Sequence, residues 1–296
     1  MARCTPPTWG IGRRRLAFCL TVVLGLLAAP GAANDQLRQF LISRSCAGCD
    51  LSGEVLAGAN LDAADLTQAN LSGANLSGAR LLRAEITQAD LGRANLHQAI
   101  LSEADLSGSN LAGANLSGAI LSGAQLVEVS APNINLEQAE ARNSNWYGSD
   151  LSGSRLDGAT FAQAGLSAVD LSNATLTDGQ FYRANMIGIR LDGADLTGAD
   201  LREVLLRDAS LAGANFTNAD LLRANLVRTD LSTARFCNTR MANGDINNEH
   251  CGDLGDLEEL AACRRNPVSR DETVQSPQVE GKADQRPLPL NILPAS

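Results

Sequence analysis

The chain has 296 residues, with 24 basic against 33 acidic side chains and a formal net charge of −9 at pH 7. Aromatic residues make up 3% of it, and Lys282 is its one lysine. Nucleic-acid binding needs clustered lysine and arginine, so this composition argues against DNA or RNA as a partner. An acidic chain of this kind also repels anionic surfaces.

Residues 1–33 have the organisation of a signal peptide. Three arginines at 13–15 precede an apolar run over 16–29, and small residues follow up to Ala33. The run is too short for a comfortable membrane span, so we predict cleavage after Ala33 and no span in the mature chain. A retained membrane anchor is the alternative. The prediction implies an exported protein.

Residues 34–49 are predicted to cap the entrance to the fold that follows. Leu37, Phe40 and Leu41 recur at helical spacing, which predicts a short helix over 34–45. Elongated repeat folds expose a hydrophobic cross-section at each end. This helix would cover the first of those ends.

A five-residue period runs from Leu51 to Ile246. Its 40 central positions hold 29 leucines, and 25 of the 40 positions two residues earlier are alanine. The motif reads A-(N/D)-L-x-x, as in 69–73. On a helix this period would spread leucines around all sides, and on a strand it would alternate faces. A coil that turns a corner every five residues and stacks on itself buries them all, so the period indicates a solenoid over 50–251.

The pattern weakens over 127–150. Ala131, Ala141 and Trp146 occupy central positions there, while the β-branched Val129 occupies a small position. Exchanging large for small side chains keeps part of the core volume. We nevertheless expect two distorted coils in this stretch.

Aromatic residues gather after this interruption. We interpret them as filling an irregular core rather than forming a binding platform. They are Trp146, Tyr147, Phe161, Phe181 and Tyr182.

The period ends after Cys251. Leu254, Leu257 and Leu260 predict a second short helix, which would cap the C-terminal end over 252–265. Residues 266–296 are rich in proline, glutamine and charge, a composition typical of disorder.

The tandem A-(N/D)-L-x-x motifs resemble the pentapeptide repeat family over about 200 of the 296 residues. The resemblance implies an all-β fold, a right-handed quadrilateral β-helix in which four pentapeptides make one square coil. Central leucine or phenylalanine and the preceding alanine would point inward. Forty pentapeptides would then give about ten coils and a rod of roughly 48 Å at ~4.8 Å per coil.

Five cysteines follow Ala33, and four are candidates for disulfides. Cys237 and Cys251 flank the last repeats, and the closing segment of exported family members is similarly bracketed by a disulfide. Cys46 and Cys49 form either a local disulfide or two buried small residues. Cys263 is left over, and the sequence assigns it no role.

Charge can be sorted by face, because residues twenty apart would stack. We call the face around central positions 61, 81 and onward to 241 the arginine face. It is a candidate interaction surface, and the alternative is simple solvation with lateral arginine–carboxylate pairs. Its arginines are Arg80, Arg83, Arg142, Arg183, Arg202, Arg223 and Arg240.

Motifs for catalysis, cofactors and metals are missing from the sequence. His97 follows a central leucine and is expected to face solvent, and there is no phosphate loop, zinc motif or nucleophile elbow. We therefore predict no catalytic, cofactor or metal site.

The leading hypothesis is a non-enzymatic exported scaffold, periplasmic or secreted, that binds an unidentified protein. A thylakoid lumen is the alternative location if the source is photosynthetic. The alternative function, implied by the family resemblance, is a DNA-mimicking protein that binds DNA gyrase. The sequence leaves the oligomeric state open.

Overall fold

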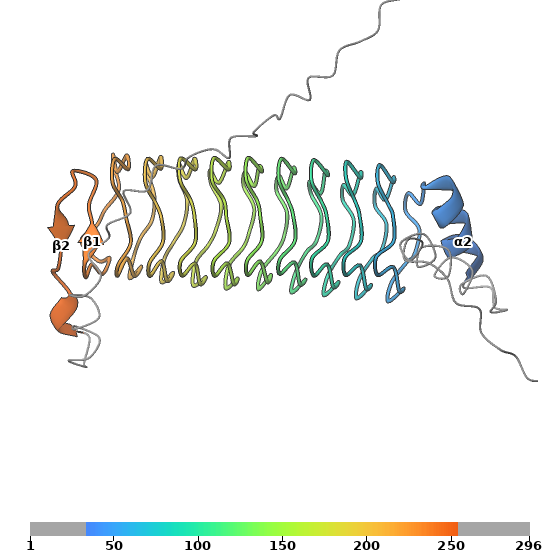
Figure 1. Ribbon diagram of the computed structural model, residues 1–296, viewed down its shortest axis with the longest axis horizontal. Helices are drawn as coiled ribbons and strands as arrows, with labels where there is room; N and C mark the ends of the chain where they lie inside the picture. Colours follow the sequence, from blue (N-terminus) through green and yellow to red (C-terminus); the bar gives the residue numbers. More distant parts are fainter. Residues whose placement is uncertain (1–33, 254–296) are drawn as a thin grey trace, which may run out of the picture.

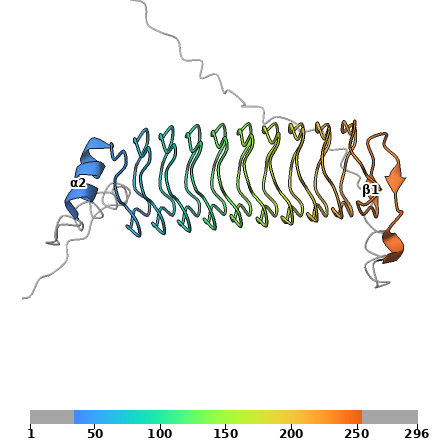
Figure 2. The ribbon, with the colours of Figure 1, turned by 180° about the vertical axis from the view of Figure 1, so that it is seen from behind.

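The computed structural model describes residues 34–253, which form a single rod (Figures 1 and 2). Helix α2 lies at one end and strands β1 and β2 lie at the other (Figure 1). The expectations for 1–33, for a helix up to 265 and for disorder over 266–296 fall on residues outside this range. The named elements are α2 (Asn34–Ser43), β1 (Thr239–Arg240), β2 (Ile246–Asn247) and the 3₁₀ turn η1 (Cys251–Asp253).

Between these ends the rod is a stack of twenty-residue coils. Asp50 pairs in parallel with Asn70, Asn70 pairs with Asp90, and such bridges recur up to the pairing of Asp220 with Arg240. Each step is held by backbone hydrogen bonds, such as Leu71 N donating to the Asp90 carbonyl at 2.7 Å. Because backbone atoms make this ladder, it tolerates many outward side chains.

The core consists of the central and small positions of each pentapeptide. Leu71 and Leu76 are fully buried, and so are Ala74 and Ala79. Burying one leucine side chain contributes about 2 kcal/mol, so the repeated leucines supply the main driving force for stacking. The five-residue period therefore reflects two inward side chains per side of the coil.

Each pentapeptide up to Arg228 ends in a tight turn whose third residue has a positive φ. Ala74 N donates to the Leu71 carbonyl at 3.0 Å across one such turn, and Gly73 has a φ of 66°. Ala63 and Arg83 hold the equivalent position at 54° and 56°. This left-handed region is free for glycine but costs other residues about 1 kcal/mol. That cost explains why glycine recurs two residues after the central leucine.

The stack remains regular through 127–150, so the predicted distortion is wrong. Gln125 pairs with Asn145 and Ser130 pairs with Asp150 in the same parallel register as elsewhere. The backbone ladder thus passes through the stretch in which the sequence pattern weakens.

The regularity is explained by large side chains of adjacent coils, which fill the space beside the small Ala141. The Trp146 ring is fully buried, 5.8 Å from the Phe161 ring, which stacks on Phe181 at 5.6 Å. Ala141 lies one pentapeptide before Trp146 and one coil before Phe161. The two large rings therefore occupy the space that a leucine at position 141 would have filled, and packing density is kept.

Buried serine hydroxyls also support the irregular stretch. Ser149 occupies a small position, donates from Oγ to the Leu126 carbonyl at 2.7 Å and accepts from Val129 N at 3.1 Å. The hydroxyl thus bridges the two backbone groups that bond directly in ordinary turns. Ser109 does the same for Ile86 and Ala89.

At the N-terminal end, α2 packs on the first coil. Leu37 and Phe40 are 1% exposed and belong to the same core cluster as the leucines of the rod. The chain then enters the first coil through Cys46 and Cys49, which form a disulfide with a Cα–Cα distance of 5.3 Å.

At the C-terminal end, a hairpin replaces the last coil. Strands β1 and β2 are antiparallel, with Thr239 opposite Asn247. Ile246 is 49% exposed, so the prediction that the inward pattern extends to it is wrong. The reason is the tight turn in which Met241 N donates to the Asp245 carbonyl at 2.8 Å and reverses the chain.

A second disulfide closes this end. It joins Cys237 and Cys251, with a Cα–Cα distance of 4.7 Å. Because the two residues are 14 positions apart, the bond ties the hairpin and the chain beyond it to the last full coil.

Candidate interaction surfaces

Outward side chains form columns along the rod. The residues just before and just after a central position share a face, as Arg80 and Asp62 do at 2.8 Å. Thr175 and Asp157 share another face, with Oγ1 donating at 2.7 Å. The residue two after the central position lies at the corner, where it contacts the corner residues of the adjacent coils, as Arg83 contacts Glu103. Each surface is therefore built from residues that are twenty apart in sequence.

Six of the seven arginines on the arginine face are paired with carboxylates of the same face. The pairs are Arg80–Asp62 (2.8 Å), Arg83–Glu103 (2.7 Å), Arg183–Glu203 (2.7 Å), Arg202–Asp200 (2.7 Å), Arg223–Glu203 (3.7 Å) and Arg240–Asp220 (3.6 Å). Arg142 forms no ion pair within residues 34–253. The face is thus a strip of mixed charge. Its exposed pairs add little stability.

The closest pairs shift the acidity of their partners. A hydrogen bond from Arg83 lowers the pKa of Glu103, and one from Arg183 lowers the pKa of Glu203. The same hydrogen bonds raise the pKa of the two arginines. Both members of each pair therefore stay charged at neutral pH.

A tyrosine forms the centre of one cluster on the arginine face. The guanidinium carbons of Arg183 and Arg202 lie 5.0 and 5.6 Å from the ring centroid of Tyr182, within the range of a cation–π contact. The sequence-based interpretation assigned Tyr182 and Tyr147 to the core, and the structure places both outside. Each directly follows a central position, and the same rule that turned His97 outward would have found them.

His97 lies close to a serine hydroxyl. Its Nδ1 is 2.8 Å from Ser117 Oγ, and both residues lie on the same face. The contact resembles part of a nucleophile–base pair, but catalysis also needs a group that orients the ring. The remaining hydrogen bonds of His97 within residues 34–253 involve its backbone, which donates to Asn95 Oδ1 and accepts from Gly78 N. We therefore interpret the contact as one of the polar contacts between side chains that stack twenty residues apart on this face.

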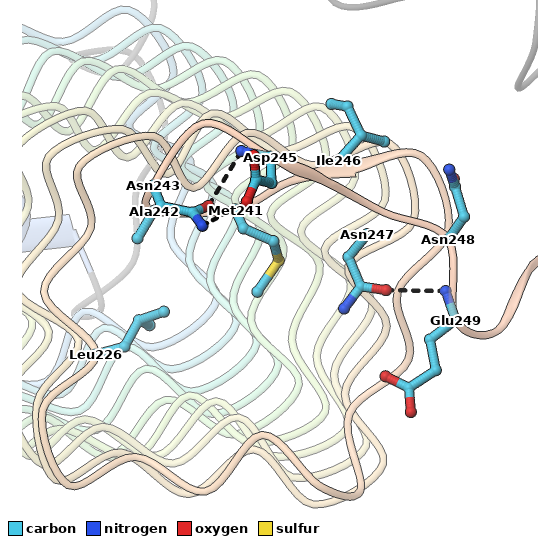
Figure 3. A pocket seen from close by; sticks show the side chains of 9 residues that line it. All are labelled: Leu226, Met241, Ala242, Asn243, Asp245, Ile246, Asn247, Asn248 and Glu249. Atoms are coloured by element: carbon cyan, nitrogen blue, oxygen red, sulfur yellow. Dashed lines mark hydrogen bonds between the residues drawn. The ribbon is translucent and has the colours of Figure 1, made fainter.

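An open groove of about 630 Å³ lies where the hairpin closes the rod (Figure 3). Leu226 and Met241 line its floor, and Asp245 and Glu249 are its acidic residues. Asn243 Nδ2 donates to Asp245 Oδ2 at 2.7 Å. The lining thus combines half-covered core leucine and methionine with amides and carboxylates, without a nucleophile beside a base.

Metal ligands do not gather within residues 34–253, where no three His, Cys, Asp or Glu side chains are placed to hold an ion. In the same part of the chain, no helix has the length and apolar character that a bilayer crossing requires.

Known proteins resemble the chain in sequence and in structure. HetL, a pentapeptide repeat protein involved in heterocyst differentiation regulation in the cyanobacterium Nostoc sp. strain PCC 7120, is 31% identical, with a TM-score of 0.62. The match covers 69% of this chain and 89% of HetL. No curated protein sequence matches the chain.

Two further solved structures are more distant. QnrB1, a plasmid-mediated fluoroquinolone resistance protein, is 19% identical over 73% of this chain and 99% of its own, with a TM-score of 0.33. A pentapeptide repeat protein of the Arabidopsis thaliana thylakoid lumen is 21% identical over 40% and 66%, with a TM-score of 0.15.

The family model of pentapeptide repeats matches eight segments between residues 45 and 243, most of which overlap. These segments are 45–83, 59–98, 84–126, 99–138, 119–158, 133–167, 164–203 and 205–243. Together with the similarity to HetL, they show that the chain belongs to the pentapeptide repeat family and folds as a right-handed β-helix.

Proposed function

We propose that the protein is an exported, non-enzymatic scaffold that binds a protein partner through the flat faces of its rod. The observation that carries the proposal is the regular stack, in which parallel bridges join residues twenty apart from Ser45 to Arg240. Such a stack presents long flat faces of repeated outward side chains, a surface that solenoids use for protein contacts. HetL, which is involved in a regulatory process, is consistent with a role of this kind.

The arginine face is the first surface to test. The Arg142 guanidinium has no carboxylate partner within residues 34–253, and the cluster of Tyr182, Arg183 and Arg202 combines an aromatic ring with paired charges. Tyrosine and arginine are enriched where proteins bind one another. A partner with both acidic and basic groups would suit this mixed strip better than a purely acidic one.

The two disulfides and the sequence of residues 1–33 support export, and α2 supports the capping of the rod. Disulfides persist in oxidising compartments, and the structure has them at both ends, at Cys46–Cys49 and Cys237–Cys251. The sequence of 1–33 adds a predicted signal peptide for a periplasmic or secreted protein, or one of a thylakoid lumen. On this proposal α2 acts as a cap, because it covers the hydrophobic end of the first coil.

The test uses affinity capture from the cell envelope, with the parent protein and face-directed variants as baits. A true partner is lost with Arg142→Glu or Tyr182→Ser and is retained with Arg155→Glu, an exposed and ion-paired arginine of another face. Retention of every captured protein by all the variants would exclude the arginine face. A reporter fused after residue 33 that stays in the cytoplasm would contradict export.

The gyrase-binding alternative is separated by a supercoiling assay. A DNA mimic inhibits gyrase when the purified protein is added at micromolar concentration, whereas the scaffold leaves supercoiling unchanged. Inhibition that survives removal of contaminating nucleases would favour the alternative.

A further inference from the structure

Exposed large apolar side chains gather on one face of the rod. Of the four in the stack over residues 45–240, three share this face, Tyr147, Leu205 and Val227 (52%, 40% and 51% exposed), and Val55 lies on another. Each of the three lies next to a central position of the same side of the coil, and the half-buried Val127 and Ile187 belong to that side too. We call these five residues the apolar patch. Large exposed apolar patches mark interaction sites.

The patch is poor in charge. In its six coils, the two outward positions on this face hold one charged residue, Arg207. Charges lie instead at the adjacent corner, where Arg228 pairs with Asp208 at 2.5 Å. A charge-poor centre with tyrosine and arginine, bordered by a polar rim, is the usual composition of a protein interface. The twelve positions are Gln125, Val127, Asn145, Tyr147, Gly165, Ser167, Asn185, Ile187, Leu205, Arg207, Asn225 and Val227.

We propose that the apolar patch joins two copies of this chain, face to face and antiparallel, about a twofold axis between the coils of Ser167 and Ile187. Reversing a second copy about that axis places Val127 opposite Val227. It also places Tyr147 opposite Arg207, and every contact occurs twice, as in any isologous interface. The inference is independent of the proposed function.

Most side chains match in size or polarity in this register, and Leu205 opposite Asn145 is the exception. Ile187 faces the shallow area left by Gly165 and Ser167, so a large side chain meets two small ones. The Tyr147 ring meets the guanidinium of Arg207, whose buried Nε has no hydrogen-bond partner within the rod. A ring over a guanidinium is a favourable contact that desolvation strengthens.

Charges at the corner match as well. Glu128 and Arg228 occupy the same corner column, five coils apart, so the reversal places Glu128 of one copy opposite Arg228 of the other. Arg228 is 62% exposed in its own pair with Asp208 and remains accessible to a second carboxylate. Complementary rim charges set register and partner more than affinity.

The area indicates a reversible dimer. About six coils overlap, and at ~4.8 Å per coil the contact buries on the order of 1,000 Å², the lower limit for specific interfaces. A second copy therefore covers the whole patch but binds weakly. We expect association in the micromolar range rather than a permanent dimer.

Sedimentation of the full chain across a wide concentration range tests the proposal. The Cys263→Ser background excludes an intermolecular disulfide. We expect a monomer–dimer equilibrium that Tyr147→Ser combined with Val227→Ser weakens by about tenfold or more. Both substitutions are outward, and thermal unfolding verifies that the rod is intact.

Charge reversal distinguishes this interface from other self-association. Glu128→Arg and Arg228→Glu should each weaken the dimer several-fold, because like charges then face each other twice. The double variant should restore it. Arg155→Glu is the matched control, since Arg155 is 61% exposed, ion-paired and on another face.

A chain that stays monomeric at all concentrations would overturn the proposal. So would a dimer that ignores the patch substitutions, or one that the double reversal does not restore. Each of these outcomes leaves the scaffold function untouched, because that function is read from partner capture rather than from sedimentation.

Discussion

Two stretches of the rod, 59–108 and 127–165, share one backbone ladder and fill their cores differently. The first repeats leucine and alanine almost without change, so each coil fills its own interior. The second combines Ala141 with Trp146 and Phe161, so neighbouring coils fill one another. The difference shows that backbone bridges and turns define the coil. The side chains need only conserve volume across adjacent layers.

Removing Trp146 should have the largest effect. Trp146→Ala opens a cavity next to the small Ala141, so we expect a loss of about 4–5 kcal/mol in the free energy of unfolding. Leu71→Ala, in the regular stretch, should cost about 3 kcal/mol because its neighbours remain large. Denaturant unfolding monitored by circular dichroism measures both. Equal losses would contradict shared filling.

Refilling the cavity sharpens the comparison. Ala141→Leu alone should overpack the core and cost about 1–3 kcal/mol. In the Trp146→Ala background the same change should recover stability, which gives a coupling of about 1 kcal/mol or more in a double-mutant cycle. Additive effects would show that the two sites do not share space.

Bridging hydroxyls are more frequent in the second stretch, where Ser149 and Ser154 each join two backbone groups, than in the first, where Ser109 does so. Ser149→Ala leaves Val129 N and the Leu126 carbonyl without their bridging hydroxyl, so we expect a loss of about 1–2 kcal/mol. Ser72→Ala in the regular stretch removes a half-exposed hydroxyl and should cost less than about 0.5 kcal/mol. Hydrogen exchange at Val129 would report the opened turn directly.

Turn positions in the regular stretch should respond to φ. Gly73→Ala places a side chain at a φ of 66° in open space, and Ala63→Gly removes one at 54°. We expect a loss and a gain of up to about 1 kcal/mol, respectively. Opposite shifts in melting temperature would confirm that φ, not contact, sets the preference for glycine.

The smallest expected effect depends on pH. Burial by itself raises the pKa of Asp157, but hydrogen bonds from Thr177 and Thr175 outweigh it and hold that pKa below its usual value. A lowered folded-state pKa contributes stability above about pH 4, which is lost as pH falls through the folded value. Because Asp157 is only partly buried, solvent screens the contribution and we expect less than about 1 kcal/mol. Asp157→Asn should abolish this component of a pH-dependent unfolding series.

Most of the fold could be predicted from the sequence, because a gapless five-residue period has few physical solutions. The family and the buried leucines and alanines followed directly. The distortion expected at 127–150 does not occur, because Trp146 and Phe161 fill the space beside Ala141 across adjacent coils. Ile246 was wrongly expected in the core because it keeps the five-residue spacing in sequence, although the chain turns back in a hairpin there and is no longer part of the stack.

Surfaces were less predictable, because pairing depends on side-chain reach across coils. The column positions of Arg83 and Glu103 follow from counting by twenties, but the choice between a pair and two solvated charges does not. Tyr147 and Tyr182 were assigned to the core by residue type, although their register places them outside. The position of each tyrosine relative to the central residue predicts its exposure better than its residue type does.

The closing disulfides have a mechanical consequence. In a stack where each coil contacts only its neighbours, unravelling begins at an end and proceeds coil by coil. The link at Cys237–Cys251 ties the hairpin to the last coil, whereas Cys46–Cys49 joins residues three apart and stiffens a single turn. Under tension we therefore expect the first opening in the half-covered turn around Leu226 and Leu231, just before the closed hairpin.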